Sequence, residues 1–407
     1  MKKIVQYKDS LFLLAGLILG GGAGLIWGEK TAIVKPVGTI FLNLMYMILV
    51  PLVFFSISAA IGQMTSKTRL GKILAATFGT FLFTSLIAAV IGFLGVALVH
   101  PIDAADSGKI LALMGSADTS EALPITERIV NLLTVDDFSK LLSKSNMLPL
   151  IIFSLLIGLA TSAKGKSAKA FQQFLVAGNA VVMQVVTYVM YLAPIGLGCY
   201  FAVIIGELGA QIINGYFRVF VLYLVVTVIY FFGVLSFYAF LASGKVGLQR
   251  FWKNIPVPAA TAMATCSSAA SIPANLEYTQ KIGVSRDIVD TVIPLGANVH
   301  KDGSVVGGIF KIAFLFLLFG RDITTPINIL AIIFGGFFVG AIMGAIPGGG
   351  LVAETLIVSL FGFPTEAIPL VIIISTIIDI PATLLNSTSN IASAMLVHRL
   401  VDKKQKL

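Results

Sequence analysis

Long uninterrupted apolar stretches are the feature of this sequence that most limits what it can fold into. The clearest runs reach or approach the roughly 20 residues that a helix needs to cross the hydrocarbon core of a bilayer; they lie at Leu11–Trp27, Ile73–Val99, Leu148–Ala163 and Val219–Leu241. Of the 407 residues, 57% are hydrophobic and only 12% are charged, against about 25% charged in a soluble domain. A water-soluble fold of this size could not bury so much apolar surface. We therefore predict an all-α polytopic membrane protein.

The distribution of positive charge predicts how the chain is oriented. A formal net charge of +9 would suggest nucleic-acid binding in a soluble protein. When alternate loops are assigned to the two sides of a membrane, however, most Lys and Arg residues fall on one side, including Lys164, Lys166, Lys169 and the lysines at both ends. Positive loops mark the cytoplasmic side. We expect a bacterial or archaeal inner-membrane protein with both termini in the cytoplasm, lipid as its surroundings and no nucleic-acid partner.

The first half of the chain reads as a series of simple spans. Because more spans follow closely and no small-residue cleavage site is present, we interpret the first run as a span and not as a signal peptide. The segment 100–146 is polar and charged, and we expect it to form an extracellular excursion. The predicted spans lie near 10–28, 34–64, 71–99, 147–164, 168–196 and 209–242.

The pattern changes after residue 250, where apolar segments are broken by small residues. Two segments, 250–286 and 326–362, are interrupted by TCSSAASIP and IPGGG, and each is followed by a helix with polar groups midway, at 288–319 and 366–398. The two units begin on opposite sides of the membrane, so they form an inverted repeat. Broken segments at matching positions of two repeats indicate a transporter with its binding site near the midplane. We therefore predict eight transmembrane helices and two re-entrant hairpins.

The last predicted helix carries a polar face. Ser375, Asp379, Thr383, Asn386 and Asn390 recur every three or four residues, within about 80° of arc on a helix. A carboxylate at a helix centre in lipid costs at least about 2.5 kcal/mol, so Asp379 should face protein, water or a ligand. The face predicts a site for a substrate ammonium group. A polar seam that holds helices together is the alternative.

A second polar group interrupts the preceding helix. His300, Lys301 and Asp302 follow one another between Gly296 and Gly303, which favours an unwound stretch with exposed carbonyls. Adjacent residues diverge in a regular helix, so direct pairing of Lys301 with Asp302 would need that unwinding. A buried Lys–Asp pair with a structural role is the alternative.

The remaining candidate functional residues lie at the two hairpin tips and at Glu354 and Lys311. Hydroxyls of Ser267 and Ser268 at one tip, and backbone amides of Gly348 to Gly350 at the other, suit a carboxylate at positive helix ends. Flexible loops without a ligand are the alternative. Glu354 is either a proton carrier or a group facing an aqueous vestibule. We expect Lys311 to snorkel or to pair, and not to bind substrate.

These motifs together resemble the sodium:dicarboxylate/glutamate–neutral amino acid symporter family, and the resemblance covers essentially the whole chain. The first hairpin is similar to that of bacterial serine/threonine transporters. The matching segments are LPLIIFSLLIGLA (148–160), LAPIG (192–196), SSAASIP (267–273), PLGANVHKDGS (294–304), PGGG (347–350) and DIPATLLNSTSN (379–390).

The resemblance implies a homotrimer in which a mobile transport domain moves like an elevator against a static scaffold. Residues 1–99 would supply the first part of the scaffold and the third helix of the transport domain. Residues 147–245 would supply scaffold and remaining helices, and residues 246–407 the core transport domain.

The resemblance also implies which residues contact substrate. Asp379 would bind the substrate ammonium. Ala382 stands where acidic amino-acid transporters carry an arginine, and without that guanidinium a side-chain carboxylate lacks its bidentate partner. We therefore expect a small neutral amino acid such as alanine, serine, threonine or cysteine. The remaining implied substrate-site residues are Ser267, Ser268, Ile346, Pro347, Gly348, Thr383 and Asn386.

The ion sites depart from the family pattern. The pattern Asn-Met-Asp-Gly-Thr reads His300-Lys301-Asp302-Gly303-Ser304 here, a carboxylate is replaced by Asn390, and a tyrosine beside Thr84 and Ser85 is Phe81. We hypothesise that Lys301 is a tethered cation that replaces sodium, which would leave transport coupled to protons or uncoupled. The alternative is residual sodium binding at Asp302, Thr84 and Ser85.

Other classes of function remain open at this point. An anion channel and a dicarboxylate carrier using Lys301 are alternatives, although the lone Asp379 would repel a second anion. An enzyme is not expected, because no catalytic triad or paired-carboxylate site has suitable spacing. The two cysteines and three histidines show no metal-ligand spacing, and we expect no cofactor and no metal beyond a coupling ion, H⁺ or Na⁺.

Overall fold

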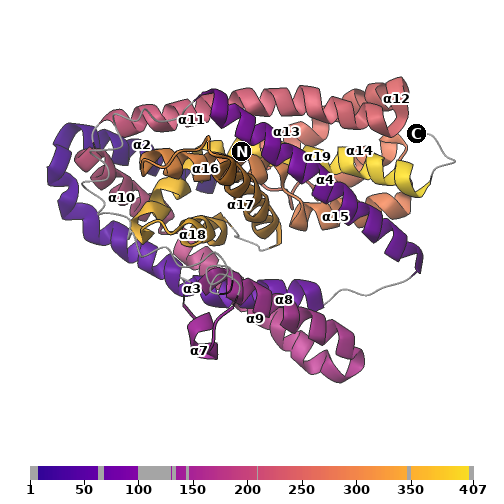
Figure 1. The fold of residues 1–407 in the computed structure, drawn as a ribbon, viewed down its shortest axis with the longest axis horizontal. Coiled ribbons are helices and arrows are strands. Elements are labelled where there is room, and N and C mark those ends of the chain that lie inside the picture. Colours follow the sequence, from indigo (N-terminus) through magenta and orange to yellow (C-terminus); the bar gives the residue numbers. More distant parts are fainter. Residues whose placement is uncertain are drawn as a thin grey trace.

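The computed structural model describes residues 8–62, 68–99, 130, 134–143, 146–208, 210–345 and 350–402. Every regular element in these ranges is helical (Figure 1). Six helical segments are long and apolar enough to cross a membrane, for example Lys72–Leu98 and Asn214–Asn254. The prediction of an all-α membrane protein is confirmed.

The helices of the first half follow the predicted spans closely, and one was missed. The helix in the span predicted at 168–196 ends at Met190. After Tyr191 and Leu192 a separate helix begins within the end of that span and continues over residues 197–208, where no span was predicted. The helices are α2 (Lys8–Trp27), η1 (Gly28–Val34), α3 (Lys35–Gly62), α4 (Thr68–Leu98), α7 (Phe138–Leu141), α8 (Met147–Lys164), η3 (Gly165–Ala168), α9 (Lys169–Met190), α10 (Ala193–Leu208) and α11 (Ala210–Val228).

The second half contains the broken segments. The π-helical η4 joins α11 to α12, and α12 kinks at Ser243 and Gly244, earlier than the predicted start of the hairpin. The elements are η4 (Ile229–Val234), α12 (Leu235–Asn254), α13 (Pro256–Thr265), α14 (Ile272–Ile282), α15 (Arg286–Val299), α16 (Asp302–Leu318), α17 (Pro326–Ala345), α18 (Gly350–Phe361), η5 (Thr365–Ala367) and α19 (Ile368–Val401).

Glycine residues allow α10, the helix that was not predicted, to pack closely on α2. A Cβ atom on Gly16 would lie 2.2 Å from the carbonyl oxygen of Pro194, and one on Gly20 would lie 2.1 Å from that of Gly198. Backbone contact of this kind is how helices associate in a bilayer, where burial of apolar side chains gives little advantage over lipid. The pair α2–α10 therefore forms one unit, and α3 packs beside it and against α8 and α9.

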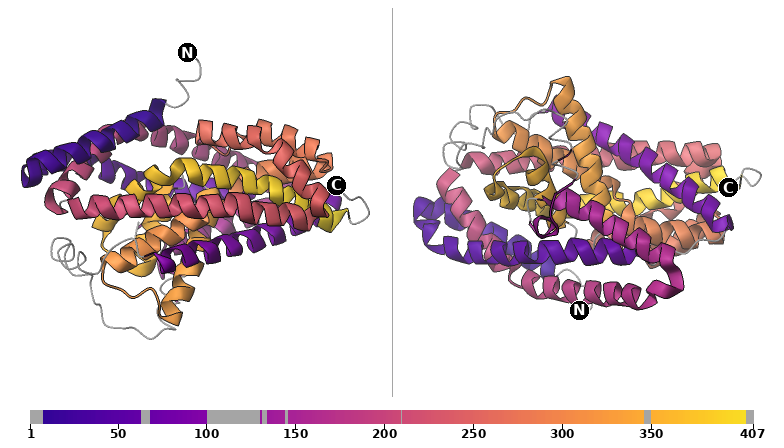
Figure 2. Two further views of the ribbon diagram at one scale, coloured as in Figure 1. Left: turned by 90° about the horizontal axis from the view of Figure 1, so that it is seen from above. Right: turned by 60° about the horizontal axis from the view of Figure 1, so that its bottom comes forward.

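A second group of helices surrounds α19. Helix α4 lies across α16 and α19, and α12, α13 and α15 also pack on α19 (Figures 1 and 2). The start of α15 meets the end of α19, where the Ser285 hydroxyl donates to Asp402 Oδ2 at 3.0 Å. Through its packing on α16 and α19, α4, the third long helix of the chain, lies with the C-terminal helices in space. The division into a static scaffold and a mobile domain stays a prediction.

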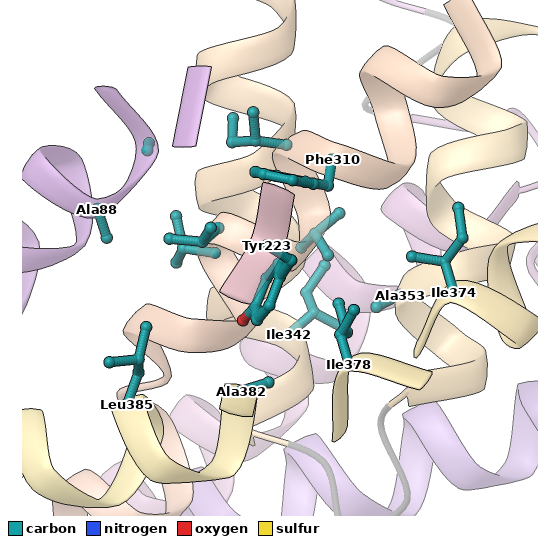
Figure 3. Packing of buried hydrophobic residues seen from close by; sticks show 14 of the residues in the cluster. Ala88, Tyr223, Phe310, Ile342, Ala353, Ile374, Ile378, Ala382 and Leu385 are labelled. Carbon is teal, nitrogen blue, oxygen red and sulfur yellow. The ribbon is translucent and has the colours of Figure 1, made fainter. Parts of the chain in front are cut away.

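The centre of this group is an apolar core that holds the polar residues in place. Figure 3 shows the ring of Tyr223 between Phe310 of α16 and Ile378 and Ala382 of α19. Its hydroxyl reaches past them and donates to the carbonyl of Gly303 at 2.7 Å. A Cβ atom on Gly303 would lie 2.3 Å from the carbonyl oxygen of Ala382. The glycine thus allows α16 to begin directly against α19.

Candidate substrate and ion-coupling site

The break between α15 and α16 is short and places two polar side chains in the core. Helix α15 ends at Val299 and α16 begins at Asp302, so only His300 and Lys301 are non-helical. His300 and Asp302 are 1% and 0% exposed. The predicted unwinding is present, but it spans fewer residues than the two glycines suggested, and Asn298 is an exposed member of α15.

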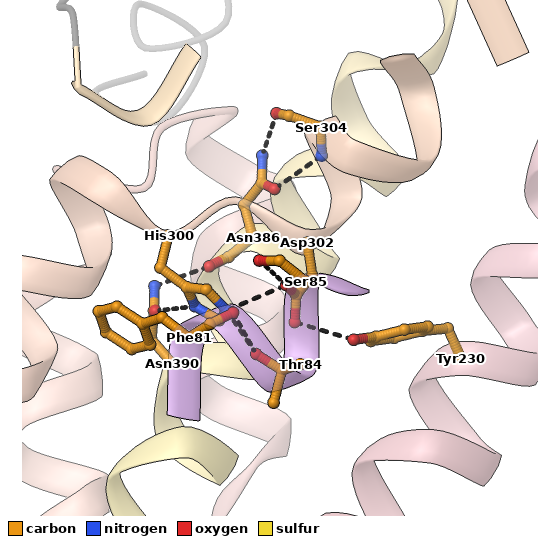
Figure 4. Close-up of polar contacts among 9 residues, drawn as sticks. All are labelled: Phe81, Thr84, Ser85, Tyr230, His300, Asp302, Ser304, Asn386 and Asn390. Carbon is orange, nitrogen blue, oxygen red and sulfur yellow. Dashed lines mark hydrogen bonds and ion pairs between the residues drawn. The ribbon is translucent and has the colours of Figure 1, made fainter. Parts of the chain in front are cut away.

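The carboxylate of Asp302 is surrounded by donors from other helices. Ser85 of α4 donates its hydroxyl to Oδ1 at 2.9 Å, and Tyr230 of η4 donates to Oδ2 at 2.8 Å. The ring nitrogen Nε2 of His300 lies 2.9 Å from Oδ1. Figure 4 shows these side chains converging on the carboxylate. Tyr230 was not foreseen, because a tyrosine within an apolar span gives no sign in sequence that its hydroxyl points inward.

The orientation of the His300 ring is fixed on three sides. Its face stacks on Phe81 with ring centroids 4.1 Å apart, and Nδ1 lies 2.8 Å from Asn390 Oδ1. The Asn390 amide nitrogen donates to the carbonyl of Asn386 at 2.8 Å, so its oxygen faces the ring and Nδ1 must donate. Nε2 then lies 2.7 Å from Thr84 Oγ1. The contact of Nε2 with Asp302 is favourable only with a shared proton between them.

The position of this ring bears on the expected sodium sites. Thr84, Ser85 and Asp302 do come together, as the resemblance implied. Their oxygens are bridged, however, by Nε2 of His300, at 2.7 Å from Thr84 and 2.9 Å from Asp302. A cation that bridged the same oxygens would need the place of this nitrogen. The arrangement therefore does not fit a sodium ion while the ring is there. The side chain that reaches these oxygens is His300 and not Lys301.

Lys301 lies near the other predicted charge. It is partly exposed, like Asp379, and within electrostatic reach of that carboxylate. Asp379 is partly exposed on α19, and within the described part of the chain it accepts a long hydrogen bond from Thr383, at 3.5 Å. It also lies within electrostatic reach of Cys266 at the first tip. Residues of the first tip and of the unwound stretch therefore lie within electrostatic reach of Asp379 on the polar face of α19.

The other predicted substrate contacts are hydrogen-bonded within the protein, buried, or outside the described residues. Asn386 accepts from the backbone of Ser304 and donates to its hydroxyl, both at 3.0 Å, so its amide is already used. At the first tip Cys266 has a left-handed φ of 47° and ends α13. Ser267 Oγ accepts from Ala270 at 3.2 Å, and Ser268 is buried. Ala382 is also buried. Ile346, Pro347 and Gly348 lie outside the described residues.

Glu354 and Lys311 form a separate buried group. The Lys311 amine lies 3.7 Å from Glu354 Oε1, with side chains 1% and 3% exposed. Of the two expectations for Lys311, snorkelling or pairing, the structure shows pairing. Glu354 does not face a vestibule in this structure, because it is buried between α16 and α19.

Comparison with known proteins identifies the family. A profile of the sodium:dicarboxylate symporter family matches residues 10–400. The chain belongs to this family. It is therefore a multi-pass membrane transporter that carries a small molecule, and not an enzyme. Its coupling ions are those of symporters, Na⁺ or H⁺.

Individual members of the sodium:dicarboxylate symporter family differ in what their names say they carry. The proton/sodium-glutamate symport protein of Bacillus subtilis is 26% identical and covers 98% of this chain and 94% of its own length. The C4-dicarboxylate transport protein of the same organism is 24% identical, with 88% and 86% covered. The L-cystine uptake protein TcyP of Shouchella clausii is 26% identical, with 96% and 89% covered.

Proposed function

We propose that this protein is an elevator-type secondary transporter for a small neutral amino acid such as alanine, serine, threonine or cysteine. The observation that carries the proposal is the surroundings of Asp379. Among the described residues this acid is partly exposed, accepts one long hydrogen bond, and lies within electrostatic reach of the first hairpin tip. A carboxylate so placed in a membrane helix suits a substrate ammonium group, and the tip hydroxyls suit the substrate carboxylate.

The small side chain at position 382 supports a neutral substrate. Ala382 is buried beside Gly303 and offers no donor. Lys301 is a positive charge near this site that a second substrate carboxylate could use, but it already lies within electrostatic reach of Asp379. In our proposal the substrate ammonium competes with Lys301 for Asp379. Lys301 therefore moves aside when substrate binds.

We further propose that transport does not require sodium. The sequence hypothesis gave the role of a tethered cation to Lys301. The geometry supports giving the cation position between Thr84 and Asp302 to His300, while Lys301 stays near Asp379. The proton shared by His300 and Asp302 supplies there the positive charge that a cation would bring. Protons then remain as the ion that drives accumulation.

The proposed setting is a homotrimer in a bacterial inner membrane with both termini in the cytoplasm. The relatives named above are bacterial proteins, which supports this location. Crosslinking in native membranes tests the trimer, and protease access to tags at each terminus tests the orientation.

Uptake by proteoliposomes tests the substrate and the ion. The purified protein is placed in vesicles with only potassium or choline salts, and labelled alanine, serine, threonine, cysteine, glutamate and succinate are offered in turn. We expect saturable, stereoselective uptake and counterflow of a neutral amino acid, abolished in Asp379→Asn. Strict dependence on sodium would refute the coupling proposal, and uptake of succinate alone would favour the dicarboxylate carrier. Conductance without counterflow would favour the anion channel.

A further inference from the structure

A buried group of three side chains lies apart from the substrate residues and has no role in the account so far. Lys311 comes from α16, Glu354 from α18 and Ser375 from α19. The Lys311 amine donates to the Ser375 hydroxyl at 2.9 Å. That hydroxyl in turn donates to Glu354 Oε1. Ser375 is thus a hydrogen-bonded bridge between a buried amine and a buried carboxylate.

The charge of Glu354 has one nearby counterpart in the described part of the chain. Of the elements that pack on α18, α17 carries no acidic, basic or histidine residue, and the only such residue of α8 is Lys164 at its end. Helix α3 has none after Lys35, and Glu366 of η5 is exposed. Helix α16 brings Lys311 and, at its start, Asp302. Helix α19 brings Asp379 one turn beyond Ser375, and His398 and Arg399 at its far end.

The protonation state of this pair decides how much charge it adds to the helices that carry it. With Glu354 ionised and Lys311 protonated the pair has no net charge, which lowers the cost of passing through the bilayer. One proton added to Glu354 leaves a neutral acid beside a charged amine, so the group gains one positive charge. A neutral amino acid adds none. A loaded carrier in this state would be drawn inward by a membrane potential that is negative inside.

We propose that Glu354 is the proton-binding residue that couples transport to the proton gradient, with Lys311 as its counter-charge and Ser375 as the bridge toward the face that carries Asp379. A proton from the outer water binds the Glu354 carboxylate, converts it to the neutral acid, and leaves to the cytoplasm after the crossing. The empty carrier returns with the ion pair re-formed. This inference rests on the proposed carrier function.

The test separates coupling from transport in Glu354→Gln. Vesicles without sodium receive a gradient of one pH unit, which supports about a tenfold accumulation in one-to-one symport, and a trapped pH dye reports proton entry. We expect the wild-type protein to accumulate its amino acid and to acidify the vesicles. Glu354→Gln should retain counterflow without a gradient but lose accumulation and substrate-dependent acidification. The exposed Glu366→Gln is the matched control and should behave as the wild type.

A second variant keeps the test decisive if the glutamine variant folds poorly, since it leaves the Lys311 charge without a partner. The double variant Lys311→Met with Glu354→Met removes both charges, and replacing a buried pair by apolar residues is often neutral for folding. It should exchange but not accumulate. Accumulation and acidification at wild-type levels in either variant would overturn the assignment of Glu354. A wild-type protein that moves no amino acid in these vesicles would instead refute the proposed carrier function.

Discussion

Replacing His300 with asparagine should turn the proton-bridged site into one that binds sodium. The ring contacts Thr84, Asn390 and Asp302 and stacks on Phe81. Without it the Asp302 carboxylate keeps Ser85 and Tyr230 as donors but loses its charge partner. Breaking a buried charge pair costs about 3–5 kcal/mol, and loss of aromatic stacking adds about 0.5–1.5 kcal/mol. We expect His300→Asn to be destabilised by about 4 kcal/mol or more in sodium-free buffer.

Sodium should recover much of this loss in the variant. The space left between Thr84 Oγ1 and Asp302 Oδ1 is lined by oxygen atoms, which are the ligands of hard cations. An ion present at 100 times its Kd stabilises the state it binds by about 2.7 kcal/mol. The measurement is the Tm of purified protein in sodium chloride against choline chloride at equal ionic strength. The wild-type Tm should be the same in both salts.

The matched control is His398→Asn. His398 is a second buried histidine of the same helical group, but it contacts Ser285 and not Asp302. Its variant should show no difference between the two salts. A sodium-dependent rise in the wild-type Tm, or no rise in His300→Asn that folds, would refute the reasoning that the ring fills the cation position.

Three further variants test other parts of the site. Asp379→Asn should lower amino-acid uptake at least about tenfold, since 1.4 kcal/mol is a factor of ten and a lost charge pair costs more. Uptake equal to wild type would exclude Asp379 from substrate binding. Ala382→Arg should bind glutamate or aspartate, because a guanidinium can bind a second carboxylate at two points, and calorimetry measures this binding. Continued preference for neutral amino acids would contradict the role given to this position. Tyr230→Phe should lower the free energy of unfolding by about 1–3 kcal/mol by removing a donor to a buried carboxylate; an unchanged denaturation midpoint would show that Asp302 does not need it.

Much of the fold was predictable because the bilayer leaves few options. Apolar runs long enough to cross it must be helical, and the breaks at TCSSAASIP and between Val299 and Asp302 are visible as polar or small residues within such runs. Helix α10 was missed because it follows α9 after only two residues, Tyr191 and Leu192, so its first residues were taken as the end of the preceding span.

The site was predictable as a set of residues but not as a set of contacts. His300 and Lys301 are neighbours in a non-helical stretch, where successive side chains point in different directions, and the sequence could not tell which one meets Asp302. The packing decides it, because Phe81 offers an aromatic face to the imidazole ring and Asn390 offers an acceptor to Nδ1. Similarly, the pairing of Lys311 with Glu354 joins residues of two helices that no periodicity connects.

A cryo-electron microscopy structure in sodium-free buffer with the transported amino acid tests the central claim most directly. The account predicts density for the ligand with its ammonium group at Asp379 and its carboxylate at the first hairpin tip, and with the His300 ring still between Thr84 and Asp302. Ligand density away from Asp379, or a ring turned out of that position with an ion in its place, would contradict it.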